Sequence, residues 1–527
     1  MIWRIGKKDL LSNIQTFRFG VGLVLCAALI PLTVYTGTET YTEKLANANA
    51  LSQKYTKQLK EARVYSYVKP RVVRLPEVLE TVSIGVSDEV GNRVDMAFGQ
   101  VPFVAVRTGQ TRDNPLLAGF LQIDTVFVVT VLLSLLGVLF GYDAISGEKE
   151  SGCLRQILCT QTSRTQVVIG KILGGGLTLM PILGLSFLIS ALVLEGSQGI
   201  LMTWEDRARI GAVFFLGLAY GMLFLMLGVL LSTRTQRSST SLMLGLFVWV
   251  FWVIVVPNIS LSIAERLNPL ASGTALNRAL AELRKEERGK INEIRDALPK
   301  LNWSTVSNSS GPDGANIITN TTKEKYEHER EYISQREPIR IAYAHKRWVL
   351  QREYLRSLEQ QAELAAWFSR LSPAFLYRNL SQILCRTDAG AYLQFMDRCR
   401  RYREELIGHF QNRNLFTSFI YFTPEPPEKH LSEDAHIAFR TAGKFKTLAE
   451  LKEGRSWFQM IKEFTAKTKS RRDYPPLDLS DLPAFQSSAE RLSGSLGRGA
   501  LDLVLLAGLW SILFVSAYVS FLRYDVR

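Results

Sequence analysis

A charged stretch at residues 141–171 interrupts the most apolar part of the sequence. It reads GYDAISGEKESGCLRQILCTQTSRTQVVIGK and lies between the runs IDTVFVVTVLLSLLGVLF and ILGGGLTLMPILGLSFLISALVL. Side chains of this kind can serve a catalytic site, an ion pathway or a contact surface for another protein. The ionisable residues concerned are Glu148, Lys149, Glu150, Arg155, Arg164 and Lys171.

Motifs for catalysis are incomplete throughout the sequence. A phosphate-binding loop would need G-x-x-x-x-G-K-[ST], but the pair Gly170–Lys171 lacks the spaced glycine before it and the Ser or Thr after it. The sequence HEREY has Tyr332 where a zinc protease needs its second histidine. His430 and His436 stand without other ligand residues, and no Ser or Cys has a recognisable base partner. We expect no catalytic site and no bound cofactor in this chain.

Six apolar runs are long enough to cross a bilayer, whose core requires roughly 20 helical residues. They lie at about 18–37, 121–142, 172–194, 210–231, 241–262 and 500–522. Their interiors lack charge, which argues against a proton-driven or sodium-driven carrier. Acidic residues stand near the predicted ends, where we expect solvent to reach them: Asp124, Asp143, Glu195, Glu265 and Asp502.

Basic residues mark one side of this six-span chain. They gather at the N-terminus, in 143–171, in 232–240 and at the C-terminus. The positive-inside rule places that side, with both termini, in the cytoplasm. Much of the net charge of +14 follows from this topology, so we expect no nucleic-acid partner. Arg207 and Arg209 fall in a short outer loop and are a mild exception.

Two large segments then lie outside. Residues 38–120 begin with a helical pattern and continue with β-branched residues between prolines and glycines, which predicts short strands. Residues 263–499 are mainly helical. Apolar stripes predict long helices at 274–298 and 323–370, joined by a polar loop. An antiparallel hairpin over 274–370 is one interpretation, and two separate amphipathic helices are the other.

Two of the five cysteines, Cys385 and Cys399, fall in the second outer segment. An oxidising compartment would allow them to form a disulfide. The alternative is a pair of free thiols whose geometry does not suit a bond. The sequence leaves both alternatives open.

The stretch at 141–171 resembles the signature of ABC-2 type exporter permeases, which has an E-x-E-x-G-T-L element followed by an arginine and a Gly-Lys pair. Cys153 departs from the pattern, because the family usually has threonine there. LPEVLETVSIGVSDEVGNRV, NPLLAGFLQID, LSRLSPAFLYRNLSQIL and FLRYDVR extend the resemblance over almost the whole chain, to a bacterial subgroup with a large outer domain between the fifth and sixth spans. The matching residues of the signature are Glu148, Glu150, Gly152, Leu154, Arg164, Gly170 and Lys171.

The resemblance implies a mainly α fold: a six-helix transmembrane bundle of ABC-2 (type V exporter-like) architecture, with a largely helical outer domain that contains a few short strands. The expected division has an N-terminal segment with the first span, a first outer segment, spans two to five with a coupling elbow at 143–171, a large outer domain, and a sixth span with the C-terminus. Its boundaries are 1–37, 38–120, 121–262, 263–499 and 500–527.

The implied function is that of a permease subunit of an ATP-binding-cassette exporter in the bacterial inner membrane. ATP and Mg²⁺ would bind to a separate ATP-binding subunit, and a second permease copy or paralogue would complete the assembly. One alternative is a mechanotransmission subunit that drives a periplasmic or envelope partner without moving a cargo. Another is a membrane scaffold or receptor with no energised partner.

The resemblance also assigns roles within the elbow, which would act as a coupling helix docked on the ATP-binding subunit. Glu148 and Glu150 would meet that subunit, with Gly152 and Leu154 in the same matched element. Arg155 and Arg164 would orient the elbow. Lys171 would hold it at the level of the lipid headgroups.

Overall fold

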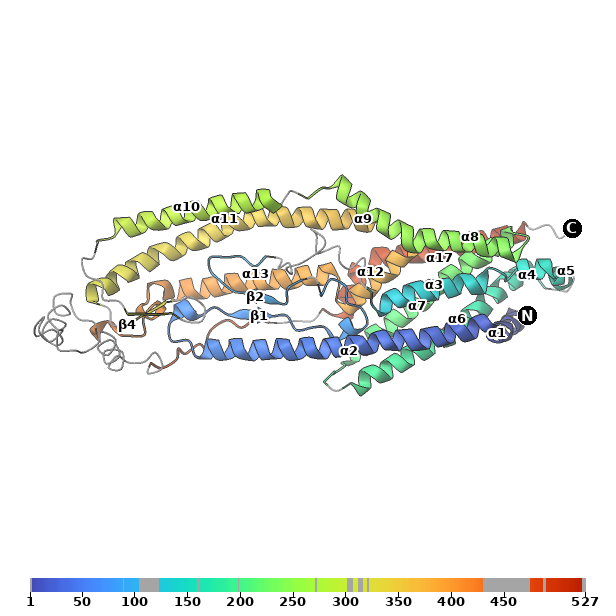
Figure 1. Ribbon diagram of the computed structural model, residues 1–527, viewed down its shortest axis with the longest axis horizontal. Coiled ribbons are helices and arrows are strands. Elements are labelled where there is room, and N and C mark those ends of the chain that lie inside the picture. The colour runs from blue at the N-terminus through green and yellow to red at the C-terminus, as the bar shows by residue number, and fades with distance from the viewer. Residues whose placement is uncertain are drawn as a thin grey trace, which may run out of the picture.

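The computed structural model describes residues 2–88, 90–103, 123–158, 162–197, 199–270, 273–300, 307–310, 316–319, 322–429, 474–486 and 490–523. The molecule is elongated and mainly helical (Figure 1). A helical bundle forms one end, where α1 lies, and a large domain extends from the bundle to the other end. The predicted fold class, mainly α with a few short strands, is confirmed.

Among the described residues, six helical segments are long and apolar enough to cross a membrane, which confirms the predicted spans. The fifth is continuous but contains a π-helical turn, η4. The six are α2 (Phe17–Lys60), α3 with α4 (Thr125–Gly141 and Ser146–Glu150), α6 (Arg164–Gly196), α7 (Trp204–Arg234), α8 with η4 and α9 (Ser238–Val250, Phe251–Val255 and Val256–Leu267), and α17 (Ala500–Leu522).

Local sequence signals start the central spans. The side chain of Asp124 accepts a hydrogen bond from the backbone N–H of Phe127 and so caps α3. Ser163 begins α6 in a capping box with Gln166. Thr203 begins α7 in the same way with Asp206 as its partner. Each of these caps satisfies backbone N–H groups that the first turn of a helix leaves without a partner.

Helices α3 and α7 form the centre of the bundle. In the most apolar stretch of each, 67% of the residues are buried, against 17% in the fifth span. Glycines allow the two backbones to touch. A Cβ atom on Gly228 would lie 2.9 Å from the Cα atom of Gly141, and one on Gly137 would lie 2.6 Å from the carbonyl oxygen of Gly221. Small residues permit this close approach between helices in a membrane.

The large domain draws on both outer segments of the chain. From the first come the end of α2 and the antiparallel strands β1 (Arg71–Val73) and β2 (Arg93–Asp95). From the second come α10 (Gly273–Ala297), α11 (Lys323–Ser369), α12 (Pro373–Cys385) and α13 (Ala389–Asn412). Val94, Leu358 and Tyr392 belong to one buried cluster, so the two segments share a core.

Helices α10 and α11, which cover most of the stretch 274–370, lie side by side (Figure 1). Polar groups join the two helices: the Tyr343 hydroxyl donates to Glu286 at 2.7 Å, and Arg347 pairs with Glu287. The apolar side chains Leu355 and Leu358 of α11 face elsewhere, because they enter the core shared with the strands. The joining stretch, expected to be a loop, contains the antiparallel pair β3 (Ser307–Ser310) and β4 (Asn316–Thr319).

Two spans run on without interruption into the large domain. Helix α2 has 44 residues, a length of about 66 Å at 1.5 Å per residue. That is about twice the thickness of a bilayer core. The fifth span likewise continues through α9, which packs against α11. The bundle and the large domain therefore share continuous helices.

Replacing Gly228 with alanine should destabilise the bundle by about 1–3 kcal/mol, because the new Cβ atom would meet the backbone of α3. The matched control is Gly184→Ala in α6, where a Cβ atom meets nothing within 4 Å. Both variants gain the same helix propensity, so the difference between their unfolding temperatures in detergent reports the steric clash. Equal unfolding temperatures would contradict the close packing of α3 and α7.

Candidate functional site

The elbow at 143–171 lies at the end of the bundle beside α1 (Ile2–Ile14) (Figure 1). We call this end the terminal face. It contains α1, α4, α5 (Cys153–Leu158) and the adjoining ends of the six spans. The described residues of the elbow include its three consecutive charged residues, Glu148, Lys149 and Glu150, each of which contacts a different part of the bundle.

Glu148 pairs with Lys171 inside the protein. The Lys171 Nζ atom lies 2.6 Å from Glu148 Oε1 and 3.1 Å from Asp9 Oδ1. The side chains are 7%, 15% and 15% exposed for Lys171, Glu148 and Asp9. Burial raises the pKa of the Asp9 carboxyl, and the charge of Lys171 opposes that rise. This ion-paired triad joins the elbow to α1 and α6.

Lys149 caps the C-terminal end of α7. Its ammonium group donates to the backbone carbonyls of Thr233, Thr235 and Ser232 at 2.6, 2.9 and 3.2 Å. The last carbonyls of a helix have no partner within that helix and carry a partial negative charge. A lysine ammonium group, with three donors, satisfies these acceptors.

Glu150 caps the N-terminal end of α8. One carboxylate oxygen accepts from the backbone N–H of Ser238 at 2.9 Å, and the other accepts from the Ser238 hydroxyl at 2.8 Å. Negative charge is favourable at the N-terminus of a helix. Lys149 and Glu150 therefore bind the two helix ends that flank the loop 235–237.

Two arginines attach the remaining spans. Arg164, the first residue of α6, donates to the carbonyls of Leu522 at 2.6 Å and Phe521 at 3.4 Å, at the end of α17. Arg18 in α2 pairs with Asp143 at 2.8 Å and lies over the Tyr142 ring. Together with the contacts of residues 148–150, these bonds connect the elbow to all six spans.

A turn at 151–153 lies on the exposed surface of the elbow. Gly152 has φ of +72°, a conformation that glycine adopts most readily. It separates α4 from α5, and Ser151, Gly152 and Cys153 are exposed. Leu154 is 2% exposed and belongs to the bundle core. The side chain of Arg155 lies outside the described part of the structure.

These contacts revise two roles expected for the elbow. The Lys171 ammonium group is buried between two carboxylates of the protein, so it does not point outward toward lipid. The Glu148 carboxylate points into the protein, whereas Glu150 is exposed. Sequence reasoning missed the contributions of Asp9 and Lys149. Their signal is weak, since a Lys between two Glu residues is typical of any solvated helix.

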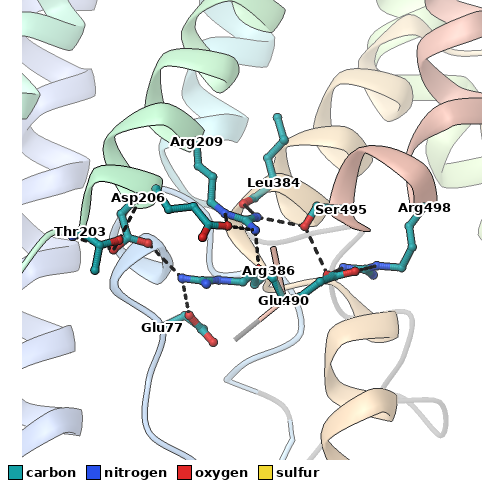
Figure 2. Close-up of polar contacts among 10 residues, drawn as sticks. Glu77, Thr203, Asp206, Arg209, Leu384, Arg386, Glu490, Ser495 and Arg498 are labelled. Atoms are coloured by element: carbon teal, nitrogen blue, oxygen red, sulfur yellow. Dashed lines mark hydrogen bonds and ion pairs between the residues drawn. The ribbon is translucent and has the colours of Figure 1, made fainter. Parts of the chain in front are cut away.

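A second polar network lies at the opposite end of the bundle, where the spans meet the large domain (Figure 2). Its centre is Arg209 of α7, whose side chain is fully buried. The guanidinium donates hydrogen bonds to the backbone carbonyls of Leu384 at 2.8 Å and Glu490 at 2.6 Å. It also donates to the Ser495 hydroxyl at 3.0 Å. Its ion pair is with Glu205, at 2.9 Å. Of the two arginines that depart from the positive-inside pattern, Arg209 is buried and Arg207 is exposed.

Two further arginines extend this network, as Figure 2 shows. Arg386 lies between Glu77 and Asp206, with its Nη2 atom 2.9 and 3.0 Å from their carboxylate oxygens. Burial raises the pKa of Glu77, and Arg386 opposes that rise. Arg498 pairs with Glu490 at 2.6 Å and also with Asp388. The network thus joins α7, α12, the segment before α17 and the first outer segment.

Two carboxylates expected to be solvated are buried instead. Asp124 is 6% exposed and accepts hydrogen bonds from the Ser83 hydroxyl and the Ile84 backbone N–H. Asp502 is 2% exposed and binds Arg370 at 2.7 Å and the Asn379 side-chain amide at 2.6 Å. Burial of a carboxylate is tolerated because partners on other elements compensate its charge.

The structure does not join Cys385 and Cys399. Both are free thiols and both are buried. Cys385 lies in the core of the bundle, whereas Cys399 lies in the cluster that contains the strands of the large domain. Of the two alternatives left open by the sequence, the structure adopts the one without a bond.

Comparison with known proteins places this architecture among transporters. A family model described as ABC-2 family transporter protein matches residues 3–526. The chain is also similar to the probable ABC transporter permease protein NosY of Stutzerimonas stutzeri, with 33% identity over 132 residues, and to that of Pseudomonas aeruginosa, with 34% over 133 residues. Each alignment covers 24% of this chain and 46% of the relative, so the chain spans about half the length of the curated relatives it matches.

Replacing Lys171 with methionine should destabilise the protein by about 3 kcal/mol, because two buried carboxylates lose their shared cation. The measurement is the unfolding temperature of the purified chain in detergent. The matched control is Lys8→Met, since Lys8 is 67% exposed and only 4.0 Å from the same Glu148 oxygen. Adding Glu148→Gln to Lys171→Met should recover part of the loss. Equal effects of the two lysine variants would refute a structural role for the triad.

Replacing Arg209 with alanine should lower the stability of the junction by about 3–5 kcal/mol, because it leaves three acceptors on two segments without their donor. Limited proteolysis of the membrane-embedded chain should then cut near residues 384 and 490 faster than in the parent. Arg207→Ala is the control, because Arg207 is 51% exposed and forms an ion pair with the exposed Glu195. Unchanged proteolysis of the Arg209 variant would contradict this prediction.

Proposed function

Because the chain belongs to the ABC-2 family transporter proteins and is a transmembrane permease subunit, we propose that it couples ATP hydrolysis by a separate subunit to outward movement of a substrate across the bacterial inner membrane. ATP and Mg²⁺ would bind to that ATP-binding subunit. The terminal face, with both termini, would be cytoplasmic, and the large domain would be periplasmic.

The observation that carries this proposal is the set of bonds from the elbow to the spans. Glu148, Lys149 and Glu150 contact α6, α7 and α8, while Asp143 and Arg164 contact α2 and α17. A force applied to the elbow would reach every span through a short, polar and partly buried contact. A loop joined to its neighbours by mobile surface side chains would not transmit force in this way.

We assign the docking contact to the exposed turn of the elbow. Glu150 and residues 151–153 are exposed on the terminal face. Glu148 would act indirectly, as a positioning residue that holds α4 against Lys171. An ATP-binding subunit that closed on ATP would move this turn, and the bonds described above would pass the movement to the spans.

A second permease copy or paralogue would complete the transporter. In the fifth and sixth spans only 17% and 22% of the most apolar stretch is buried within the chain. Helix faces of this kind need lipid or another apolar surface. This arrangement supports an assembly in which the spans with exposed faces meet a partner, while α3 and α7 stay in the interior of each subunit.

A second candidate function is mechanical work on a periplasmic or envelope partner without transport. The continuity of α2 and of the fifth span with the large domain favours it. The Ser372 hydroxyl also donates to the carbonyl of Trp252 in the π-helical turn, which ties the base of the large domain to the fifth span. Movement of the bundle would therefore displace the large domain.

The proposed docking predicts that the variant Glu148→Ala/Glu150→Ala loses stimulated ATPase activity, because the turn is no longer held on α6 and α8. The measurement uses the complex with its ATP-binding subunit, purified from native membranes and placed in sealed vesicles. The control is Glu282→Ala/Glu353→Ala, which removes the same charge from exposed positions of the large domain. Full stimulated activity in the first variant would refute the docking contact.

A second measurement separates lost docking from lost folding. Cys153 is exposed, whereas Cys26, Cys385 and Cys399 are buried. In a Cys159→Ser background, the ATP-binding subunit should slow maleimide labelling of Cys153 at least about tenfold in the parent and not in the Glu variant. ATP-driven substrate accumulation in the vesicles supports the exporter. ATPase activity that responds to an outer partner, without accumulation, would favour the mechanical alternative.

A further inference from the structure

A pocket of about 770 Å³ opens in the large domain, away from the bundle and from both networks described above. Its walls come from the β1–β2 ribbon and from the facing sides of α10 and α11. Figure 1 shows α10 and α11 along one edge of the large domain and the ribbon nearer its middle. Buried apolar side chains, among them Val94, Met96 and Leu280, form part of its lining.

The ribbon supplies cations to one wall. Arg71 of β1 and Arg93 of β2 both line the pocket and share a single carboxylate, Asp95, at 3.0 and 3.4 Å. Tyr55 of α2 supports both arginines: its ring lies under the Arg71 guanidinium, and its hydroxyl accepts from Arg93 at 3.3 Å. The single carboxylate of Asp95 thus pairs with two guanidinium groups, both of which Tyr55 holds in place.

Helix α10 adds two arginines to the opposite wall. Arg284 and Arg288 are four residues apart and therefore lie on the same face of the helix. Both are exposed, and neither forms an ion pair with any described residue. The neighbouring carboxylate Glu287 is already bound to Arg347.

Helix α11 completes the arrangement with buried or half-buried arginines. Arg347 is 8% exposed and is held between Glu287 and the carbonyl of Gly99, to which it donates at 2.8 Å. Arg340 lines the pocket beside it, and a Cβ atom at Gly99 would lie 3.1 Å from its guanidinium. The absence of a side chain at Gly99 leaves room for that group.

With Lys69, seven cationic side chains line the pocket against two carboxylates, Asp95 and Glu287. Arg340 also pairs with Glu337, which lies outside the lining, at 3.0 Å, so the pocket keeps a clear excess of positive charge. A concave surface of one charge sign concentrates the field and attracts ions of the opposite sign. Arginine forks match the geometry of carboxylate and phosphate groups in particular. The volume is that of a small-molecule site and exceeds what a single inorganic anion needs.

We propose that this pocket binds a soluble, multiply charged oxyanion that presents several phosphate or carboxylate groups. Arg284 and Arg288 bind the ligand directly, since no described carboxylate neutralises them. Arg71, Arg93 and Arg347 are held in place by protein partners and define the shape of the site. The site is independent of the proposed export function, because its residues have no contact with the elbow.

The test is calorimetric titration of the purified full chain in discs of uncharged lipid, with tripolyphosphate and citrate as probes. Arg284→Gln/Arg288→Gln should weaken binding of the preferred probe at least about tenfold, because each lost charge-assisted contact weakens binding several-fold. High salt should weaken binding by the parent chain as well. Tighter binding of tripolyphosphate indicates a phosphate-bearing ligand, and tighter binding of citrate indicates a carboxylate-bearing one.

The matched control is Arg278→Gln/Lys285→Gln, which removes two charges from exposed positions of the same helix that do not line the pocket. This control should bind the probe within about twofold of the parent. The substituted arginines are exposed, so the unfolding temperature should stay unchanged in both variants. Failure of the parent to bind either probe, or equal weakening in both variants, would overturn the proposal.

Discussion

The ends of the transmembrane helices at the terminal face carry polar backbone groups that need partners, and a single short segment provides several of them. Lys149 binds the last carbonyls of α7, and Glu150 binds the first N–H of α8. Glu148 meets the buried cation of α6. The charges of Lys149 and Glu150 therefore match helix polarity, since a C-terminus attracts a cation and an N-terminus attracts an anion, whereas the charge of Glu148 matches Lys171. The arrangement of the spans at this face depends on that match.

At the opposite end of the bundle, arginine side chains are the partners of the polar groups. Arg209, Arg386 and Arg498 bind carbonyls and carboxylates from segments that are distant in sequence. Between the two polar ends, contact is apolar and close, and glycines such as Gly141 and Gly228 bring α3 and α7 together. Hydrogen bonds and ion pairs therefore hold the helices together at both ends of the bundle, and close apolar packing holds them together in the middle. This construction suits a body that transmits displacement along its length.

The sequence predicted the spans well because bilayer thickness imposes a simple rule on length and polarity, and it predicted α10 and α11 from their periodicity. It did not predict the partners of the charged residues. Spacing alone favours contacts with another protein for Glu148 and Glu150, because it does not reveal that Lys171 returns to the same place. Position near the span ends predicts solvated side chains for Asp124 and Asp502, because their partners, Ser83 and Arg370, lie on elements that only tertiary structure brings near. Arg209 departs from the positive-inside pattern, but the exposed Arg207 does so too, and only the structure distinguishes them.

The partners of Arg209 also set an order of assembly during synthesis. Its carboxylate Glu205 is four residues away, so it is available as soon as the fourth span is made. The carbonyl of Leu384 appears 175 residues later and the hydroxyl of Ser495 appears 286 residues later. The fourth span therefore enters the membrane with its arginine only partly compensated. The junction can close only when the chain has been made as far as Ser495, so a product truncated before Glu490 would leave this cation only partly compensated and expose it to cellular quality control.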